Sequence, residues 1–304
     1  MSGAPIEIAL GPLLFNWSAE RIADFYAAIA DETGVERVYL GEVVCGKREP
    51  FISGPLAEAA ERLTRAGKTV VWSTLALPAT PRDRRGIAQL AAGETLVEIN
   101  DVSALAHRPF GAPFVAGPLL NIYNEAAARE LIGRGCVRLC PNVELSLPTI
   151  GRLAQACPGL EIELFAYGRL PLALSGRCYH ARVRGLHKDS CQLVCDRDPD
   201  GLAVRTLEGQ DFLAVNGVQT LSHGTQVADL PIAELRTAGV GALRLSPHTG
   251  DMRKVITAFR DFSQERLSPQ DLAAQVREAG PPGPLVNGYL HGRAGVDWAP
   301  APAA

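Results

Sequence analysis

Residues 35–77, VERVYLGEVVCGKREPFISGPLAEAAERLTRAGKTVVWSTLAL, contain a complete strand–helix–strand unit. The apolar run at 35–40 is typical of a short buried strand, and the run at 69–77 is rich in the β-branched residues that strands favour. Residues 55–65 between them have the length and apolar spacing of a helix. Because this order of elements is typical of α/β proteins, the stretch favours a sheet whose strands alternate with helices.

The same alternation continues on both sides of this unit. Further strands are predicted at residues 6–10, 95–99, 113–116, 137–139, 160–167 and 242–245. Further helices are predicted behind the N-cap residue Ser18 and at residues 81–91, 125–133, 146–157 and 251–266. Eight strands that alternate with helices form the pattern of a TIM-like (β/α)8 barrel, which is the α/β fold we expect.

Residues 168–241 interrupt this pattern between the seventh and eighth strands. This insertion carries Cys178, Cys191 and Cys195. It also contains a predicted β-hairpin, residues 202–207 and 212–215 joined by EGQD, and a predicted helix at 231–238 that returns to the barrel. We therefore expect one barrel domain over residues 1–279, with the insertion as part of it.

The segment after this domain, residues 280–304, is a tail rich in proline, glycine and alanine. Its NGYLHGRAGVDW stretch, residues 287–298, has aromatic side chains that are expected to dock on the barrel. The final APAPAA, residues 299–304, is expected to be disordered.

Composition excludes several classes of protein. The chain has 304 residues, 47% of them apolar, and a net charge of −3, so nothing favours a nucleic-acid partner. No run of eighteen apolar residues is present, so we expect no transmembrane segment. The first residues lack the basic start of a signal peptide, and we therefore expect a cytoplasmic protein.

Four of the seven cysteines are candidates for a metal site. Disulfides are not expected in a reducing compartment. Cys178, Cys191 and Cys195 are clustered, and Cys45 lies in the loop after the second strand. Because the loops that follow barrel strands share one rim, the distant Cys45 is expected to join the other three. Four thiolates suit zinc or an iron–sulfur cluster. The irregular spacing favours a cluster; zinc, or cysteines without a ligand, remain alternatives.

Other polar residues on the predicted rim have two interpretations each. Cys140 ends the sixth strand near the site, whereas Cys136 and Cys157 are expected to be packing residues. His180 is either a loop residue, a base or a donor to a cluster sulfur, and His248 is either an exposed loop residue or part of the site. Pocket lining or helix capping is expected of Asn16, Glu42, Asn100, Asp101 and Asn121. The insertion also has a basic stretch, formed by Arg177, Arg182, Arg184 and Lys188. This stretch is either a solvated loop or balances the negative charge of a cluster.

The stretch ELFAYGRLPLALSGRC, residues 163–178, resembles the signature of the collagenase-like peptidase family. The residues that agree with the signature are Glu163, Phe165, Gly168, Gly176 and Cys178. The earlier cysteine of the signature is replaced here by Pro171. This departure, together with GEVVCGKRE around Cys45, the KDSCQLVC run and NGYLHG, resembles a branch of the family that acts in oxygen-independent ubiquinone biosynthesis.

The resemblance implies a [4Fe–4S] cluster, an iron centre held by Cys45, Cys178, Cys191 and Cys195. It also implies a heterodimer with a UbiU-like protein, and contacts with a lipid-carrier accessory protein and ubiquinone precursors. The chain would then be a subunit of an O2-independent ubiquinone-ring hydroxylase. Since all four thiolates are ligands, electron transfer is the favoured role for the cluster. The alternatives are a collagenase-like peptidase, for which no HExxH or Ser-His-Asp pattern is present, and a zinc-stabilised scaffold or binding subunit.

Overall fold

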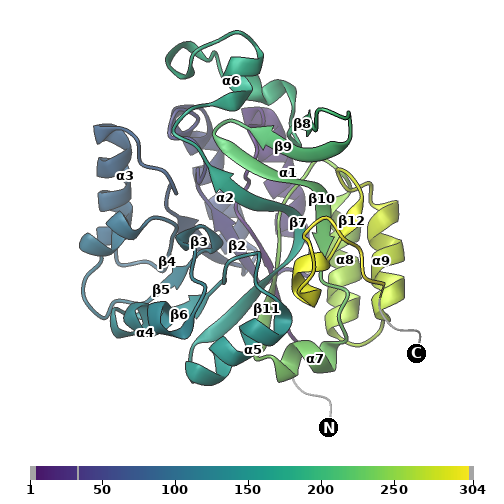
Figure 1. The fold of residues 1–304 in the computed structure, drawn as a ribbon. Helices are drawn as coiled ribbons and strands as arrows, with labels where there is room; N and C mark the ends of the chain where they lie inside the picture. Colours follow the sequence, from purple (N-terminus) through teal and green to yellow (C-terminus); the bar gives the residue numbers. More distant parts are fainter. Residues whose placement is uncertain (1–4, 33, 301–304) are drawn as a thin grey trace.

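Eight parallel strands form a closed barrel in the computed structural model, which describes residues 5–32 and 34–300 (Figure 1). Each strand pairs with the next along the chain, and the last pairs with both the first and the seventh, which closes the barrel. The predicted TIM-like fold is confirmed. The barrel strands are β1 Glu7–Leu10, β2 Arg37–Leu40, β3 Thr69–Ser73, β4 Val97–Ile99, β5 Phe114–Ala116, β6 Cys136–Leu139, β7 Glu161–Leu174 and β11 Val240–Leu245.

Helices cover the outside of this barrel, and their apolar faces pack on the strands. Ser18 accepts a hydrogen bond from the Arg21 N–H and caps the first helix, as predicted. The α-helices around the barrel are α1 Ala19–Asp31, α2 Glu49–Arg65, α3 Pro81–Ala92, α4 Glu125–Gly133, α5 Leu147–Ala156, α7 Ile232–Thr237, α8 Met252–Ser263 and α9 Pro269–Glu278. Short 3-10 helices lie at η1 Val102–Ala106, η2 Pro118–Leu120, η3 Lys188–Ser190, η4 Val194–Arg197 and η5 Gly288–His291.

Two helices differ from the sequence-based prediction. Helix α2 begins at Glu49 rather than at residue 55, because Pro50 occupies its first turn, where the missing N–H costs nothing. Pro55, where the predicted helix began, lies inside the helix. Helix α9 was not predicted; Ser268 caps it by accepting the Asp271 N–H, and Pro269 occupies its first turn.

A network of charged side chains lies inside the barrel. Arg244 is buried; its Nε lies 2.7 Å from Glu163 Oε1 and its Nη1 lies 2.5 Å from Glu98 Oε1. Glu163 Oε2 also accepts a hydrogen bond from the Tyr39 hydroxyl at 2.5 Å and from Arg138 at 3.2 Å. Burial would raise the pKa of Glu163, but the two guanidinium groups hold it below its usual value. The signature glutamate is therefore a structural element of the barrel interior.

The insertion begins where β7 leaves the barrel. Through Tyr167 this strand pairs with β11, and from Tyr167 onward it pairs antiparallel with β10 Gln219–Val227. Gly168 lies at the junction with φ +125°, and a Cβ there would lie 2.6 Å from the Cβ of Ser246, so glycine is required. Pro171, which has no N–H to donate, lies opposite an irregularity in the β10 register, where a proline is tolerated.

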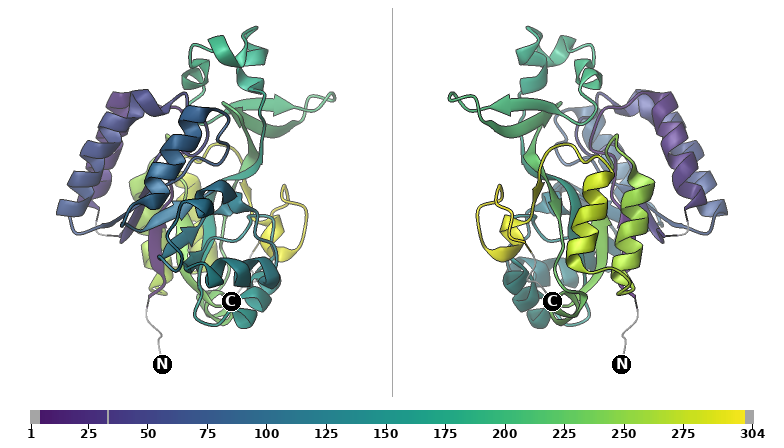
Figure 2. Two further views of the ribbon diagram at one scale, coloured as in Figure 1. Left: turned by 90° about the vertical axis from the view of Figure 1, so that its left-hand side faces the viewer. Right: turned by 90° about the vertical axis from the view of Figure 1, so that its right-hand side faces the viewer.

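Two further strands continue this antiparallel sheet. The predicted hairpin is confirmed: β8 Leu202–Arg205 pairs with β9 Asp211–Asn216, which in turn pairs with β10. The short helix α6 Tyr179–Val183 precedes the hairpin. Figure 2 shows that α6 and the hairpin project together beyond one end of the barrel. This end carries the clustered cysteines.

The C-terminal segment packs on the base of this sheet. Strand β12 Leu285–Val286 pairs in parallel with β10. Asn287 donates to Asp229 Oδ1 at 2.7 Å and to the Ala299 carbonyl at 2.8 Å, and it accepts from the Ala299 N–H at 2.7 Å. Residues 301–304, most of the segment expected to be disordered, lie outside the described residues. None of the described helices combines the length and apolar character needed to cross a lipid bilayer.

Candidate functional site

The four candidate cysteines line one small pocket between a barrel loop and the insertion. Cys45 comes from the loop after β2, and Cys178 is the N-cap of α6. Cys191 ends η3, and Cys195 lies in η4. Positions up to 150 residues apart in the sequence are therefore brought together. The remaining cysteines, Cys136, Cys140 and Cys157, do not line this pocket and are buried elsewhere.

A buried carboxylate shapes the loop that carries Cys45. Glu42 Oε1 accepts the N–H groups of Val44 and Cys45, each at 2.8 Å. The Arg48 N–H donates to the Cys45 carbonyl at 2.9 Å and closes the turn. Burial raises the pKa of Glu42 above its usual value, although the Arg48 guanidinium 3.8 Å away opposes this. Glu42 therefore positions Cys45 and does not line the cysteine pocket itself.

The insertion is fastened to the barrel beside the pocket. Asn216 donates to the carbonyls of Cys195 at 2.9 Å and Asp198 at 2.8 Å, and its Oδ1 accepts from Arg48 at 2.6 Å. Lys47 Nζ donates to the Lys188 carbonyl at 2.5 Å, which links the Cys45 loop to η3. Through these contacts the two halves of the cysteine site are held in one arrangement.

Positive charge surrounds the thiols. Arg48 is completely buried and its Nη2 lies 3.5 Å from Cys195 Sγ, while Lys47 and Lys188 also line the pocket. Of the basic stretch predicted to balance the site, only Lys188 lines it; the exposed members are Arg177, Arg182 and Arg184. Arg48 was not singled out from the sequence, and its place three residues after Cys45 was the available signal.

The buried thiols are weak acids in the absence of a metal. Burial raises the pKa of Cys45, Cys178 and Cys195 above the usual value for a thiol, and Arg48 only partly opposes this for Cys45 and Cys195. These groups are therefore poor nucleophiles near neutral pH, and a metal that binds them must displace protons. Within residues 5–32 and 34–300, no three His, Cys, Asp or Glu side chains are grouped closely enough to hold a single metal ion.

The two candidate histidines have different positions. His180 lines the cysteine pocket, is buried, and has Nδ1 3.2 Å from the Val215 carbonyl and Nε2 3.0 Å from Asp198 Oδ2. His248 lies away from the thiols; its Nε2 is 2.5 Å from the Tyr167 hydroxyl, and its Nδ1 accepts the Gly250 N–H at 2.8 Å. His248 is thus buried, and its two contacts hold the loop that follows β11 in place.

The buried His248 is expected to make the fold sensitive to acid. Burial lowers its pKa from 6.5 to about 4. Because the unfolded chain then binds the proton more readily, stability falls as the pH drops from about 6.5 to 4, by up to about 3 kcal/mol. Urea unfolding of His248→Gln over this range should show a shallower loss than the wild type, whereas the exposed control His107→Gln should follow the wild type. An equally steep loss in His248→Gln would contradict this assignment.

The other candidates on the rim form hydrogen bonds that hold neighbouring segments or cap a helix. Asn16 Nδ2 donates to the Leu193 carbonyl at 3.2 Å, and Asn100 Nδ2 donates to Glu98 Oε2 at 3.1 Å. Asp101 accepts the Ser103 N–H at 2.9 Å, and Asn121 accepts from Asn142 at 2.9 Å. The expected helix-capping role is therefore seen for Asp101, while Asn16 steadies the segment between Cys191 and Cys195.

Comparisons with known proteins give one strong similarity. The family model described as peptidase family U32 matches residues 17–299. Among solved structures, the chain is similar to a truncated form of 3-deoxy-D-arabino-heptulosonate 7-phosphate synthase from Thermotoga maritima (11% identity, 92% of this chain, 89% of that chain, TM-score 0.33). A second is phospho-2-dehydro-3-deoxyheptonate aldolase (DAHP synthase) from the same organism (10% identity, 91% and 68%, TM-score 0.32). The assignment of the barrel rests on its strand order, not on these two.

Proposed function

Because the chain belongs to peptidase family U32, we propose that it is a UbiV-like member of this family and carries a [4Fe–4S] cluster on Cys45, Cys178, Cys191 and Cys195. It then acts with a UbiU-like partner in the O2-independent hydroxylation of the ubiquinone ring. The observation that carries the proposal is the convergence of four thiols on one pocket beside a buried guanidinium group.

The residues of the pocket suit an iron–sulfur cluster. Four cysteine thiolates are the usual ligand set, and when bound the cluster supplies one-electron transfer. Apolar parts of Ala181, Leu193 and Val194 line the same pocket and limit contact with water. Arg48 balances negative charge on the thiolates and places an N–H group toward Cys195 Sγ. The Ala181 N–H, 3.4 Å from Cys178 Sγ, gives a second such donor.

The ligand count favours electron transfer over direct activation of a substrate. Each iron of a four-iron cluster would have its own thiolate, so this chain offers no iron free for a substrate. Glu42 and Asn216 keep Cys45 and Cys195 in place through backbone contacts. A rigid ligand set suits electron transfer, since it limits the rearrangement that a change of charge would cause.

Peptidase activity is the main alternative within the family. The raised pKa values of three pocket thiols work against a thiolate nucleophile. His180, the nearest candidate base, has both ring nitrogens within 3.2 Å of other groups, Val215 and Asp198. A zinc-stabilised scaffold is the other alternative.

Anaerobic purification with the candidate partner separates these functions. The protein should be brown, should contain about four iron and four sulfide per chain, and should co-purify with a UbiU-like protein. Colourless protein that contains zinc would favour the scaffold. Cleavage of a peptide by metal-free protein would favour the peptidase.

The buried guanidinium group is expected to raise the reduction potential of the centre. Reduction adds one negative charge to the cluster, and the Arg48 guanidinium stabilises this charge as a charged hydrogen-bond donor. In Arg48→Gln this stabilisation of the reduced state is lost, so the midpoint potential should fall by roughly 60–130 mV. Arg48→Lys keeps the charge and should shift the potential less. Potentiometric titration followed by electron paramagnetic resonance measures both. An unchanged or higher potential in Arg48→Gln would contradict the role given to Arg48.

A further inference from the structure

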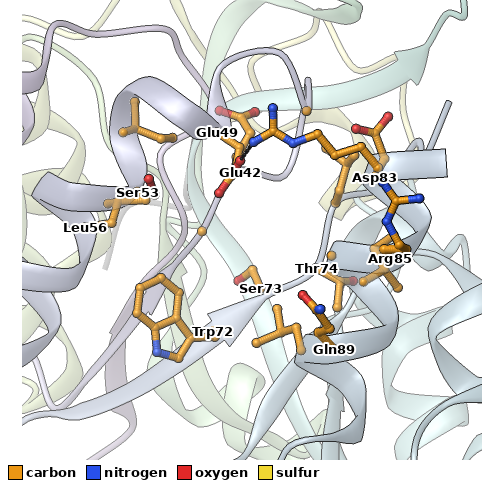
Figure 3. A pocket seen from close by; sticks show the side chains of 18 residues that line it. Glu42, Glu49, Ser53, Leu56, Trp72, Ser73, Thr74, Asp83, Arg85 and Gln89 are labelled. Carbon is orange, nitrogen blue, oxygen red and sulfur yellow. Dashed lines mark hydrogen bonds and ion pairs between the residues drawn. The ribbon is translucent and has the colours of Figure 1, made fainter. Parts of the chain in front are cut away.

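A second pocket lies on the outside of the barrel, between helices α2 and α3. This α2–α3 cleft has a volume of about 440 Å³, which is within the usual range for small-molecule sites. Figure 3 shows Ser53 and Leu56 of α2 on one side, Arg85 and Gln89 of α3 on the other, and Trp72 of β3 between them. Trp72 and Ser73 of β3 also line the cleft between the two helices.

The floor of the cleft is suited to a flat apolar ring. Trp72 is only partly buried, and its neighbours in the lining include Ile52, Leu56, Ile87 and Leu90. An indole face bordered by aliphatic side chains favours an aromatic ligand, because ring stacking and apolar burial act together. Gly86 also lines the cleft and leaves it open, since a Cβ at this position would meet no atom within 4 Å.

The charged side chains of the lining differ in how far they are engaged by other groups. Glu49 forms an ion pair with Arg82 at 2.6 Å, and the Asp83 carboxylate accepts the Thr80 N–H at 2.9 Å. Glu42 is held by the Cys45 loop. Arg85 forms no ion pair with any residue that the structure describes. Asp83 also has no ion pair among the described residues, but the Thr80 N–H engages its carboxylate, so Arg85 is the charged group that remains available to an anionic group of a ligand.

The cleft also reaches the cysteine site. Gly46 lines it next to Cys45, and Asp83 packs so closely on Gly46 that a side chain there would meet the carboxylate. Glu42 lines the same cleft while its Oε1 holds the Cys45 N–H. A molecule in the cleft would thus contact Gly46, the residue after Cys45, and Glu42, whose Oε1 accepts the Cys45 N–H.

We propose that the α2–α3 cleft binds an aromatic carboxylic acid, with its ring against Trp72 and its carboxylate toward Arg85. Binding of this ligand does not require a cluster. Only the idea that the ligand takes part in the hydroxylation of an aromatic ring rests on the proposed function. Ligands of such folds usually bind at the mouth of the barrel. The α2–α3 cleft is a different place, on the outside of the barrel.

Calorimetric titration of anaerobically purified protein with 2-naphthoate and with the neutral 2-naphthamide tests the proposal. For probes of this size we expect a dissociation constant of about 1 mM for 2-naphthoate, and binding about fivefold weaker for the amide. Gly86→Leu, which fills the cleft, should weaken both probes at least about tenfold. Arg85→Gln should remove the preference for the acid and keep the binding of the amide.

Matched variants control for general effects of these changes. Gly54→Leu places the same side chain at an open position of α2 outside the cleft, and Arg84→Gln removes a neighbouring exposed arginine that does not line it. Both should bind the probes as the wild type does. Absence of saturable binding, or equal binding by Gly86→Leu and wild type, would overturn the proposal. Iron content, measured on the same samples, separates this outcome from failure of the proposed cluster.

Discussion

Replacing Cys45 with alanine is expected to reduce the iron content of the anaerobically purified protein from about four atoms per chain to less than about one. In the proposed cluster, Cys45 is the ligand from the barrel loop after β2, whereas Cys178, Cys191 and Cys195 all come from the insertion. Three thiols on one segment cannot complete a four-thiolate site. Iron and sulfide analysis, with the visible absorption of the brown protein, measures the loss.

Cys157→Ala is the matched control for this experiment. Cys157 is buried at the end of α5 and does not line the cysteine pocket, so its replacement should leave about four iron per chain. A fully loaded cluster in Cys45→Ala would show that the pocket is not the cluster site. Equal losses in both variants would mean that iron content follows general stability and not ligation.

Replacing Arg244 with methionine is expected to lower the free energy of unfolding by about 3–5 kcal/mol, because it leaves buried carboxylates without their partner. Glu98 would lose its only ion pair among the described residues, and Glu163 would keep only Arg138 as a cationic neighbour. The guanidinium group also lies 4.1 Å above the Tyr39 ring, so packing is lost as well. Urea unfolding followed by circular dichroism measures the change.

Two variants make this prediction specific to the barrel interior. Arg134→Met removes an exposed ion pair with Glu130, 3.0 Å long, and should change the stability by less than about 1 kcal/mol. The double variant Arg244→Met with Glu98→Gln should recover part of the loss, since one of the unpaired charges is gone. A loss below about 1 kcal/mol in Arg244→Met would contradict the structural role given to the interior network.

Local patterns predicted most of the barrel. Each short apolar run formed a strand because a buried strand needs only a few consecutive apolar residues, as at residues 35–40. The extension of β7 and its partner β10 were missed. Their residues alternate less clearly, and Pro171, which cannot donate to a strand ladder, lies at a register irregularity that the sequence does not show. Helix α9, which was not predicted, has an N-cap at Ser268 and a first-turn proline at Pro269, and these are the local signals for its start.

The candidate site was predictable as a set of residue types but not as an arrangement. The clustered cysteines Cys178, Cys191 and Cys195 were visible as a motif, and the barrel pattern placed Cys45 on the same rim. The contacts that organise the site were not visible in the same way. Asn216 and Arg48, joined at 2.6 Å, are 168 positions apart. No local pattern links two such residues.

Sequence patterns predict the alternation of strands and helices, the TIM-like barrel and the four candidate thiols. The three-dimensional arrangement adds three features: Glu163 belongs to the barrel interior, Arg48 is the cation beside Cys195, and a cleft opens between α2 and α3. Periodicity and capping act between residues a few positions apart, whereas burial, ion pairing and cavities depend on closure of the barrel, which brings distant segments into contact.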